Sequence, residues 1–209
     1  YDANHRIMWY YMIPEPRPCF NLDLLEELKK FQHIIERINR NEIEQGNECP
    51  IQYAVLASRY PGIFNLGGDL SLFARFIKTK DIDGLRRYAR SCIDVLYHNY
   101  VNFNLPMTTI SLVQGDAMGG GLEAALSSNV VIAERSALLG FPEILFNLFP
   151  GMGAYSLLAG RLDSVRAEKM IFSGRIHSAS ELYEMGIIDV LAEDGEGENA
   201  VYEYIKKHS

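Results

Sequence analysis

Three consecutive glycines, Gly119–Gly121, constrain this chain more than any other feature of its sequence. Ordering three glycines costs backbone entropy, so the fold must need a positive φ angle there or a close approach to the main chain. The run that follows, Leu122-Glu123-Ala124-Ala125-Leu126, predicts a helix. The glycines therefore lie at a helix N-terminus, where unpaired N–H groups and the positive end of the helix dipole can bind negative charge.

Strands and helices alternate along the rest of the chain, which predicts an α/β domain with a mainly parallel sheet and surrounding helices. Apolar β-prone runs predict strands over 6–13, 51–58, 108–113, 129–133, 137–140 and 187–191. Helical spacing of apolar residues predicts helices over 22–38, 83–100, 154–160, 164–172 and 180–184. The polar stretch 40–50 and the acidic stretch 193–199 are predicted loops.

The composition is that of a globular protein, and 209 residues are best interpreted as one domain, 1–209. A net charge of −7 argues against nucleic acid as a partner, because the densest cationic runs, Lys78-Thr79-Lys80 and Arg86-Arg87, are short. No apolar run reaches the roughly 18–20 residues that span a bilayer. Three cysteines without CxxC spacing predict reduced thiols, a cytoplasmic location and no metal site: Cys19, Cys49 and Cys92.

Two loops share the order strand, glycines, helix. Gly67-Gly68 follows the strand over 51–58, and Gly119–Gly121 follows the strand over 108–113. Two N–H groups that converge from such loops would form an oxyanion hole, which stabilises negative charge on a carbonyl oxygen. For the first loop, a plain tight turn without a ligand is an equal alternative. Neither loop is a nucleotide-binding fingerprint, and no serine lies in a GxSxG elbow.

Two carboxylates accompany the second loop. Glu123 falls in the first turn of the predicted helix, where it could merely complement the helix dipole. Glu143 lies between Pro142 and an apolar run, a context in which a carboxylate is costly unless it is paired or protonated. Two carboxylates near one apolar pocket support general acid and base catalysis.

These residues resemble the crotonase (enoyl-CoA hydratase/isomerase) superfamily over nearly the whole chain. Within it, three stretches resemble most closely the diffusible-signal-factor synthases, which make cis-2-unsaturated fatty acids. Those stretches are Pro16-Arg17-Pro18-Cys19-Phe20-Asn21, Pro61-Gly62-Ile63-Phe64-Asn65-Leu66-Gly67-Gly68-Asp69-Leu70 and the aromatic segment from Leu145 to Ser156.

The resemblance implies a spiral of ββα units that assembles as a homotrimer or hexamer. It places the oxyanion hole on the N–H groups of Gly68 and Gly120 and makes Glu123 and Glu143 the catalytic pair, with their acid and base roles open. It also implies further C-terminal capping helices, which we expect to be largely missing from this chain. The predicted substrate-binding residues are Leu66, Gly67, Gly119, Phe141, Leu148, Gly151 and Met152.

The implied function is a dehydratase and thioesterase that converts 3-hydroxyacyl thioesters into 2-unsaturated fatty acids, as in quorum sensing. The substrate would be carried on the phosphopantetheine of acyl-carrier protein or CoA, with no other cofactor. The resemblance also implies a sensor kinase as a partner. The alternatives are a 2-enoyl-CoA hydratase/isomerase and a non-catalytic acyl-binding regulatory protein on the same fold.

Overall fold

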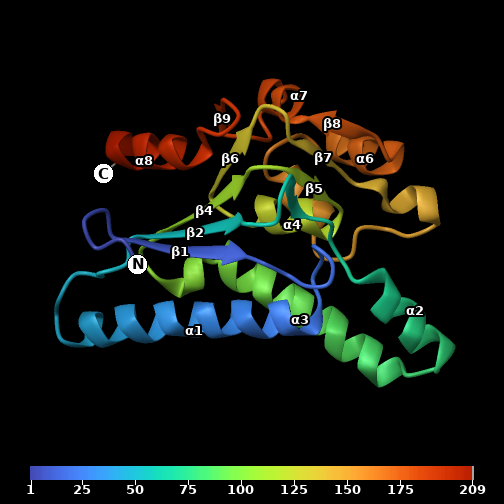
Figure 1. The fold of residues 1–209 in the computed structure, drawn as a ribbon, viewed down its shortest axis with the longest axis horizontal. Coiled ribbons are helices and arrows are strands. Elements are labelled where there is room, and N and C mark those ends of the chain that lie inside the picture. The colour runs from blue at the N-terminus through green and yellow to red at the C-terminus, as the bar shows by residue number, and fades with distance from the viewer. Residues whose placement is uncertain (209) are drawn as a thin grey trace.

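The computed structural model describes residues 1–208, which form two β-sheets surrounded by helices (Figure 1). All strands of the first sheet are parallel, in the order β1 (Ile7–Met12), β2 (Tyr53–Ser58), β4 (Thr108–Val113), β6 (Val130–Glu134) and β9 (Val190–Ala192). The second sheet has the order β3 (Ile63–Asn65), β5 (Asp116–Met118), β7 (Leu138–Gly140) and β8 (Ile176–Ser178), with only β7 and β8 antiparallel. The predicted α/β class with a mainly parallel sheet is confirmed.

The chain builds these sheets as a spiral. Three times in succession a longer strand joins the first sheet and the short strand after it joins the second: β2 then β3, β4 then β5, β6 then β7. The two predicted glycine loops therefore occupy equivalent places in successive turns, directly after β3 and β5. This repetition brings the two loops together although about fifty residues of chain separate them.

Eight α-helices lie around the sheets in the part of the chain that the structure describes: α1 (Leu22–Glu44), α2 (Leu70–Lys78), α3 (Ile82–Tyr100), α4 (Gly120–Leu126), α5 (Ala154–Ala159), α6 (Ser164–Ser173), α7 (Ala179–Glu184) and α8 (Gly197–His208). Two 3-10 helices add to them, η1 (Asn102–Asn104) and η2 (Pro142–Phe146). Side chains of Asn21, Asp69, Asp81, Asp163 and Ser178 accept hydrogen bonds from the first turns of α1, α2, α3, α6 and α7, so the sequence itself marks where these helices begin.

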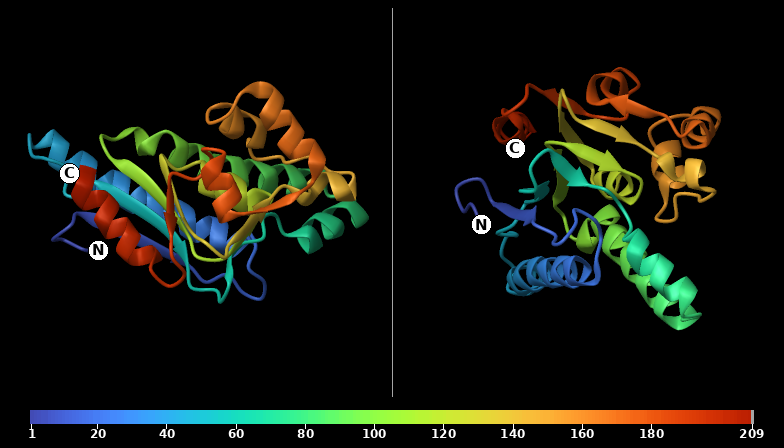
Figure 2. Two further views of the ribbon diagram at one scale, coloured as in Figure 1. Left: turned by 90° about the horizontal axis from the view of Figure 1, so that it is seen from above. Right: turned by 45° about the vertical axis from the view of Figure 1, so that its right-hand side comes forward.

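Apolar side chains alternate between the two faces of the first sheet. Val55, Ile110 and Ile132 face α8, where Val201 and Ile205 cover them. The opposite face packs on the largest apolar core, which includes residues of α1, α3 and α4 (Figure 1). The α2 helix and the start of α3 project from this body at one end (Figure 2). No helix within residues 1–208 combines the length and apolar character that a membrane span requires.

Tertiary contacts shift several predicted boundaries. The α1 helix continues to Glu44, through part of the predicted loop over 40–50, because the buried Asn39 amide exchanges hydrogen bonds with the backbone of Ile51 at 2.8 and 3.1 Å. The last strand is β9, which begins only at Val190, since Ile187 and Ile188 pack into the core before it. The predicted acidic loop over 193–199 gives way to α8 from Gly197. The short strands β3, β5 and β8 were not predicted as strands.

Candidate active site

The two glycine loops touch each other. A methyl group built on Gly67, whose φ is +84°, would lie 2.8 Å from the Gly120 nitrogen. A methyl group built on Gly120 would lie 3.3 Å from the Gly67 Cα and 3.6 Å from the Gly68 nitrogen. Glycine at both positions therefore allows the N–H groups of Gly68 and Gly120 to approach one another closely.

Both of these N–H groups are available to a ligand. Gly120 is the first residue of α4 and has no intrahelical acceptor. Gly68 lies between β3 and α2, and no backbone acceptor for its N–H occurs among the loop and turn hydrogen bonds of residues 1–208. Two unpaired donors side by side are the arrangement that binds a developing oxyanion.

Side chains hold the first loop in place. The buried Asn65 Oδ1 accepts a hydrogen bond from the Gly67 N–H at 2.7 Å. The hydroxyl of Tyr88, on α3, accepts from the Asp69 N–H at 2.8 Å and donates to the Phe20 carbonyl at 2.6 Å. Gly68 is thus fixed from both sides, by an acceptor for the residue before it and another for the residue after it.

Backbone packing holds the second loop. The Gly119 N–H donates to the Gly140 carbonyl at 2.8 Å. A methyl group on Gly121 would lie 1.9 Å from the Asn65 carbonyl oxygen, and one on Gly119 would lie 2.3 Å from Glu143 Oε1. The triple glycine is therefore required by three close approaches, with Gly119 also at a φ of +53°.

Glu123 lies on α4, one turn after Gly120, and is buried. Its Oε1 accepts two hydrogen bonds of 2.8 Å, from the N–H groups of Met152 and Ala154. Burial raises the pKa of Glu123 to about 7 against the opposing effect of these amides, and the charge of Glu143 raises it further. A carboxyl group with a pKa near neutrality is suited to give and take a proton.

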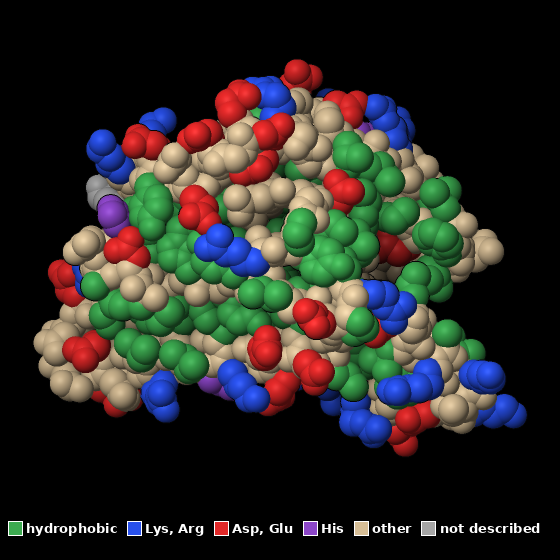
Figure 3. All heavy atoms as spheres, in the orientation of Figure 1, with side chains coloured by type: hydrophobic (Ala, Val, Ile, Leu, Met, Phe, Trp, Pro, Cys, Tyr) green, Lys and Arg blue, Asp and Glu red, His purple; other side chains and the backbone are tan. Residues whose placement is uncertain are grey.

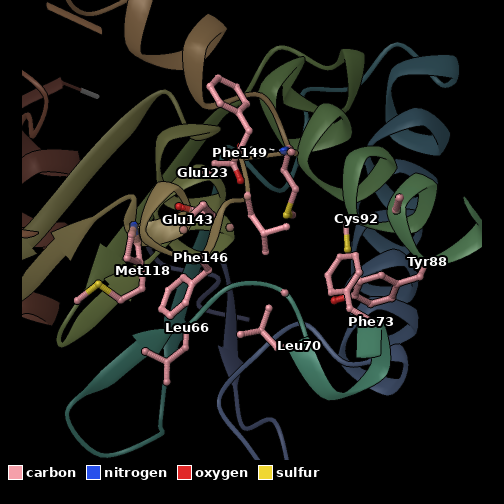
Figure 4. Close-up of a pocket in the computed structure, with 18 of the residues that line it drawn as sticks. Leu66, Leu70, Phe73, Tyr88, Cys92, Met118, Glu123, Glu143, Phe146 and Phe149 are labelled. Carbon is pink, nitrogen blue, oxygen red and sulfur yellow. Dashed lines mark hydrogen bonds between the residues drawn. The ribbon is translucent and has the colours of Figure 1, made fainter. Parts of the chain in front are cut away.

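Glu143 lies in η2, beside Glu123 on the same side of the cavity (Figure 4). Burial raises the pKa of Glu143 as well. Its Oε2 is one of two buried side-chain polar atoms within residues 1–208 that have no hydrogen-bond partner. A buried carboxylate oxygen without a partner is costly, so this atom is placed for a ligand that enters the cavity.

A cavity of about 440 Å³ connects these groups. Nine of the predicted site residues line it: Leu66, Gly68, Gly119, Gly120, Glu123, Glu143, Leu148, Gly151 and Met152. Two predicted substrate-binding residues lie elsewhere. Phe141 is fully buried in the core, and Gly67 packs behind the loop against Gly120.

The far wall of the cavity comes from α2 and α3 and was missed in the sequence. Phe73, Tyr88 and Cys92 lie opposite the glutamates (Figure 4). Their helical spacing indicated core packing, and sequence alone does not distinguish a core from a cavity wall. Burial raises the pKa of the Cys92 thiol to about 12, so this thiol acts as an apolar wall rather than a nucleophile. Within residues 1–208 no three His, Cys, Asp or Glu side chains form a group that could hold a metal ion.

Known proteins share this fold and sequence pattern. Residues 34–206 match the family described as enoyl-CoA hydratase/isomerase. Mitochondrial methylglutaconyl-CoA hydratase of Homo sapiens is 30% identical over 171 residues, which are 82% of this chain and 48% of that protein.

Among solved structures, enoyl-CoA hydratase from Bacillus anthracis has a TM-score of 0.83 at 25% identity, over 97% of this chain and 72% of that chain. DspI of Pseudomonas aeruginosa has a TM-score of 0.81 at 26% identity, over 97% of this chain and 76% of that chain. This chain spans about half the length of the curated relatives that it matches. It belongs to the enoyl-CoA hydratase/isomerase family, within the crotonase superfamily.

Proposed function

We propose that this protein removes water from 3-hydroxyacyl thioesters and then cleaves the thioester, releasing a 2-unsaturated fatty acid. One observation carries the proposal. The buried carboxyl group of Glu123 and the half-buried one of Glu143 share one apolar cavity with the unpaired N–H groups of Gly68 and Gly120. The proposal includes a cytoplasmic enzyme that needs no cofactor beyond the phosphopantetheine arm of its substrate and assembles as a trimer or hexamer.

In the first step, the N–H groups of Gly68 and Gly120 bind the thioester carbonyl and make the protons on C2 more acidic. One glutamate takes a proton from C2, and the other gives a proton to the 3-hydroxyl, which leaves as water. A double bond forms between C2 and C3. Because the pKa of Glu123 is about 7 and that of Glu143 is raised, a protonated and an ionised carboxyl group can coexist at neutral pH.

In the second step, a glutamate removes a proton from water as that water attacks the thioester carbonyl. The same two N–H groups stabilise the tetrahedral oxyanion. As it collapses, the carbon–sulfur bond breaks and the glutamate returns its proton to the leaving sulfur, which releases the free acid and the thiol. Support for this step comes from the resemblance of three sequence stretches to the diffusible-signal-factor synthases. The cavity geometry serves either step, since both pass through negative charge on the same oxygen.

A 2-enoyl-CoA hydratase/isomerase is the second candidate. The human relative named methylglutaconyl-CoA hydratase supports it, as does the family match over residues 34–206. That reaction uses the same glutamates and the same N–H pair but leaves the thioester intact. The two functions therefore differ only in whether the thioester bond is cleaved.

Incubation of the full chain with 3-hydroxyacyl thioesters of CoA and of acyl-carrier protein separates the candidates. Free 2-unsaturated acid and a free thiol, detected by mass spectrometry and a thiol reagent, support the proposal. An equilibrium of hydroxyacyl and enoyl thioesters supports the hydratase. No turnover of any thioester, together with saturable acyl binding, supports the non-catalytic alternative.

Glu123→Gln and Glu143→Gln test the site. Each keeps the size of the side chain and removes its proton transfer, so each should lower kcat by about 10²- to 10⁴-fold. Leu138→Gln, on an exposed side chain outside the cavity, is the matched control and should keep wild-type turnover. Full activity in both glutamate variants would show that catalysis occurs elsewhere.

A further inference from the structure

The two cationic runs that look too short in the sequence come together in the fold. Lys78 ends α2 and Lys80 follows in the turn to α3. Arg86 and Arg87 lie near the start of α3, and the two helices contact each other. Residues 70–90 carry six cationic side chains and two acidic ones, a net charge of +4. Since the whole chain carries −7, the remaining residues carry −11. The α2–α3 tip, residues 70–90, is thus a cationic surface on an acidic protein.

These cations are exposed and mostly unpaired. Arg86 lies 3.5 Å from Asp83, but the other five have no carboxylate within 4.0 Å among residues 1–208. Lys and Arg side chains gather at the end of the molecule where Figure 1 places α2 (Figure 3). The six cations are Arg75, Lys78, Lys80, Arg86, Arg87 and Arg90.

The same tip presents large apolar side chains to solvent and borders the cavity. Leu70, Ile77 and Ile82 are 57, 67 and 61% exposed. Leu70 and Ile77 also line the cavity, so the cationic surface adjoins the cavity wall. Exposed apolar groups surrounded by charge are typical of a protein–protein interface.

We propose that the α2–α3 tip docks an acidic carrier protein, which delivers the acyl group on its thioester arm into the cavity. The inference rests on the proposed function. The acidic remainder of the molecule repels such a partner, while the tip attracts it, so the two fields orient the carrier over the cavity. The exposed Leu70, Ile77 and Ile82 then form the apolar centre of the contact.

A free phosphate ligand fits this surface less well. Phosphates bind at helix N-termini with free N–H groups, but Asp81 occupies the N-terminus of α3 and Asp69 that of α2. A phosphate also gains nothing from three exposed aliphatic side chains. The charge and the apolar groups together favour an acidic protein surface over CoA phosphates.

Charge reversal tests the docking surface. Lys78→Glu/Arg87→Glu changes the charge of the tip by four units without touching the cavity lining. Lys206→Glu/Lys207→Glu is the matched control, because it makes the same charge change on α8 at the opposite end (Figure 1). The probe is fluorescently labelled 3-hydroxydodecanoyl acyl-carrier protein, and its binding to the full chain is measured by fluorescence anisotropy.

We expect the tip variant to weaken carrier binding by about tenfold or more and the α8 variant to change it less than about twofold. Raising the salt concentration should weaken wild-type binding and have less effect on the tip variant. For turnover, the tip variant should lower kcat/KM for the carrier-protein thioester but keep that for the same acyl group on CoA.

Three results would contradict the proposed docking surface. These are unchanged carrier binding in the tip variant, an equal loss of carrier binding in the tip and α8 variants, and a loss of kcat/KM for the CoA thioester as large as that for the carrier-protein thioester. Binding of the tip to anionic phosphatidylserine vesicles, lost in the tip variant while carrier binding persists, would assign it to membranes instead. If the wild-type chain binds the carrier through the tip but turns over no thioester, the proposed function fails and the docking surface stands.

Discussion

The two glycine loops provide equivalent N–H groups, but they are held in different ways. The loop at Gly67–Gly68 depends on side chains from elsewhere, Asn65 and Tyr88, which accept hydrogen bonds from the amides on either side of Gly68. The loop at Gly119–Gly121 depends on the absence of side chains, since each glycine lies against another part of the structure. Loss of a polar side chain therefore affects the first loop, whereas gain of a methyl group affects the second loop at all three glycines and the first loop at Gly67.

The difference follows from where each loop lies. The first loop lies between β3 and α2, where side chains of β3 and α3 reach it. The second loop lies against the first loop and against the side chains of Glu143 and Met152, so its glycines have no room for side chains. Identical chemistry at two equivalent turns of one spiral thus has two kinds of structural support, and substitutions can separate them.

The largest effect should come from Gly121→Ala. Its new methyl group would lie 1.9 Å from the Asn65 carbonyl oxygen, a backbone atom that cannot move without disturbing both loops. We expect a loss of about 3 kcal/mol in the free energy of unfolding, measured by urea denaturation. Gly151→Ala is the control, because its methyl group meets no atom nearer than 4.0 Å. It should change stability by less than about 0.5 kcal/mol. Equal stability of the two variants would contradict the role of close packing in the second loop.

Of the two loops, only the second should make the free energy of unfolding depend on pH. Its helix α4 carries Glu123, whereas the first loop places no acid in the cavity wall. Since the pKa of Glu123 rises from 4.5 to about 7 on folding, its stabilising contribution is complete below pH 4.5 and is lost as the pH rises through 7. Above pH 7 the free energy of unfolding is thus lower, by up to about 3 kcal/mol, than it is below pH 4.5. Glu123→Gln should therefore gain stability relative to wild type between pH 5 and pH 8, as followed by urea denaturation. A difference independent of pH would show that the carboxyl group is not titrating in this range.

Asn65→Ala should act on the first loop. It leaves the Gly67 N–H without its acceptor inside the protein, which should cost about 1–2 kcal/mol of stability. Because Gly68 is then less well placed, we expect kcat to fall by about tenfold with a smaller change in KM. Asn65→Asp restores an acceptor oxygen and should recover part of kcat. A stability loss with unchanged kcat would show that Asn65 serves only the fold.

Tyr88→Phe should have the smallest effect of the four. It removes the hydroxyl that joins the Asp69 N–H to the Phe20 carbonyl but keeps the ring packed at 5.2 Å against Phe73. We expect a loss of about 1 kcal/mol in stability and a decrease of a few fold in kcat. Tyr97→Phe, on an exposed ring of the same helix, is the matched control and should be neutral. A larger effect on kcat than that of Asn65→Ala would show that the loop is held mainly from its C-terminal side.

Much of the fold could be predicted because its signals are local. Caps such as Asn21 and Asp81 mark helix starts, and the apolar runs of β2 and β4 mark buried strands. Of the second sheet only β7 was predicted, within the strand over 137–140, since β3, β5 and β8 have three residues each, too few for a periodic pattern. Asn65 offered a weak signal for its role, because Asn before glycines commonly accepts a hydrogen bond from the backbone two residues on. Tyr88 offered none, as it fits the apolar spacing of α3.

The sequence by itself determined the α/β class, the two glycine loops and the two glutamates, because glycine runs and acids in apolar surroundings are costly wherever they occur. Only the tertiary structure decided how these residues meet. The spiral joins Gly67 to Gly120, gives Phe73, Tyr88 and Cys92 a cavity wall as well as core contacts, and keeps Phe141 out of the cavity. It also joins two short cationic runs into one surface. These arrangements depend on contacts between distant segments, which the pattern of neighbouring residues does not encode.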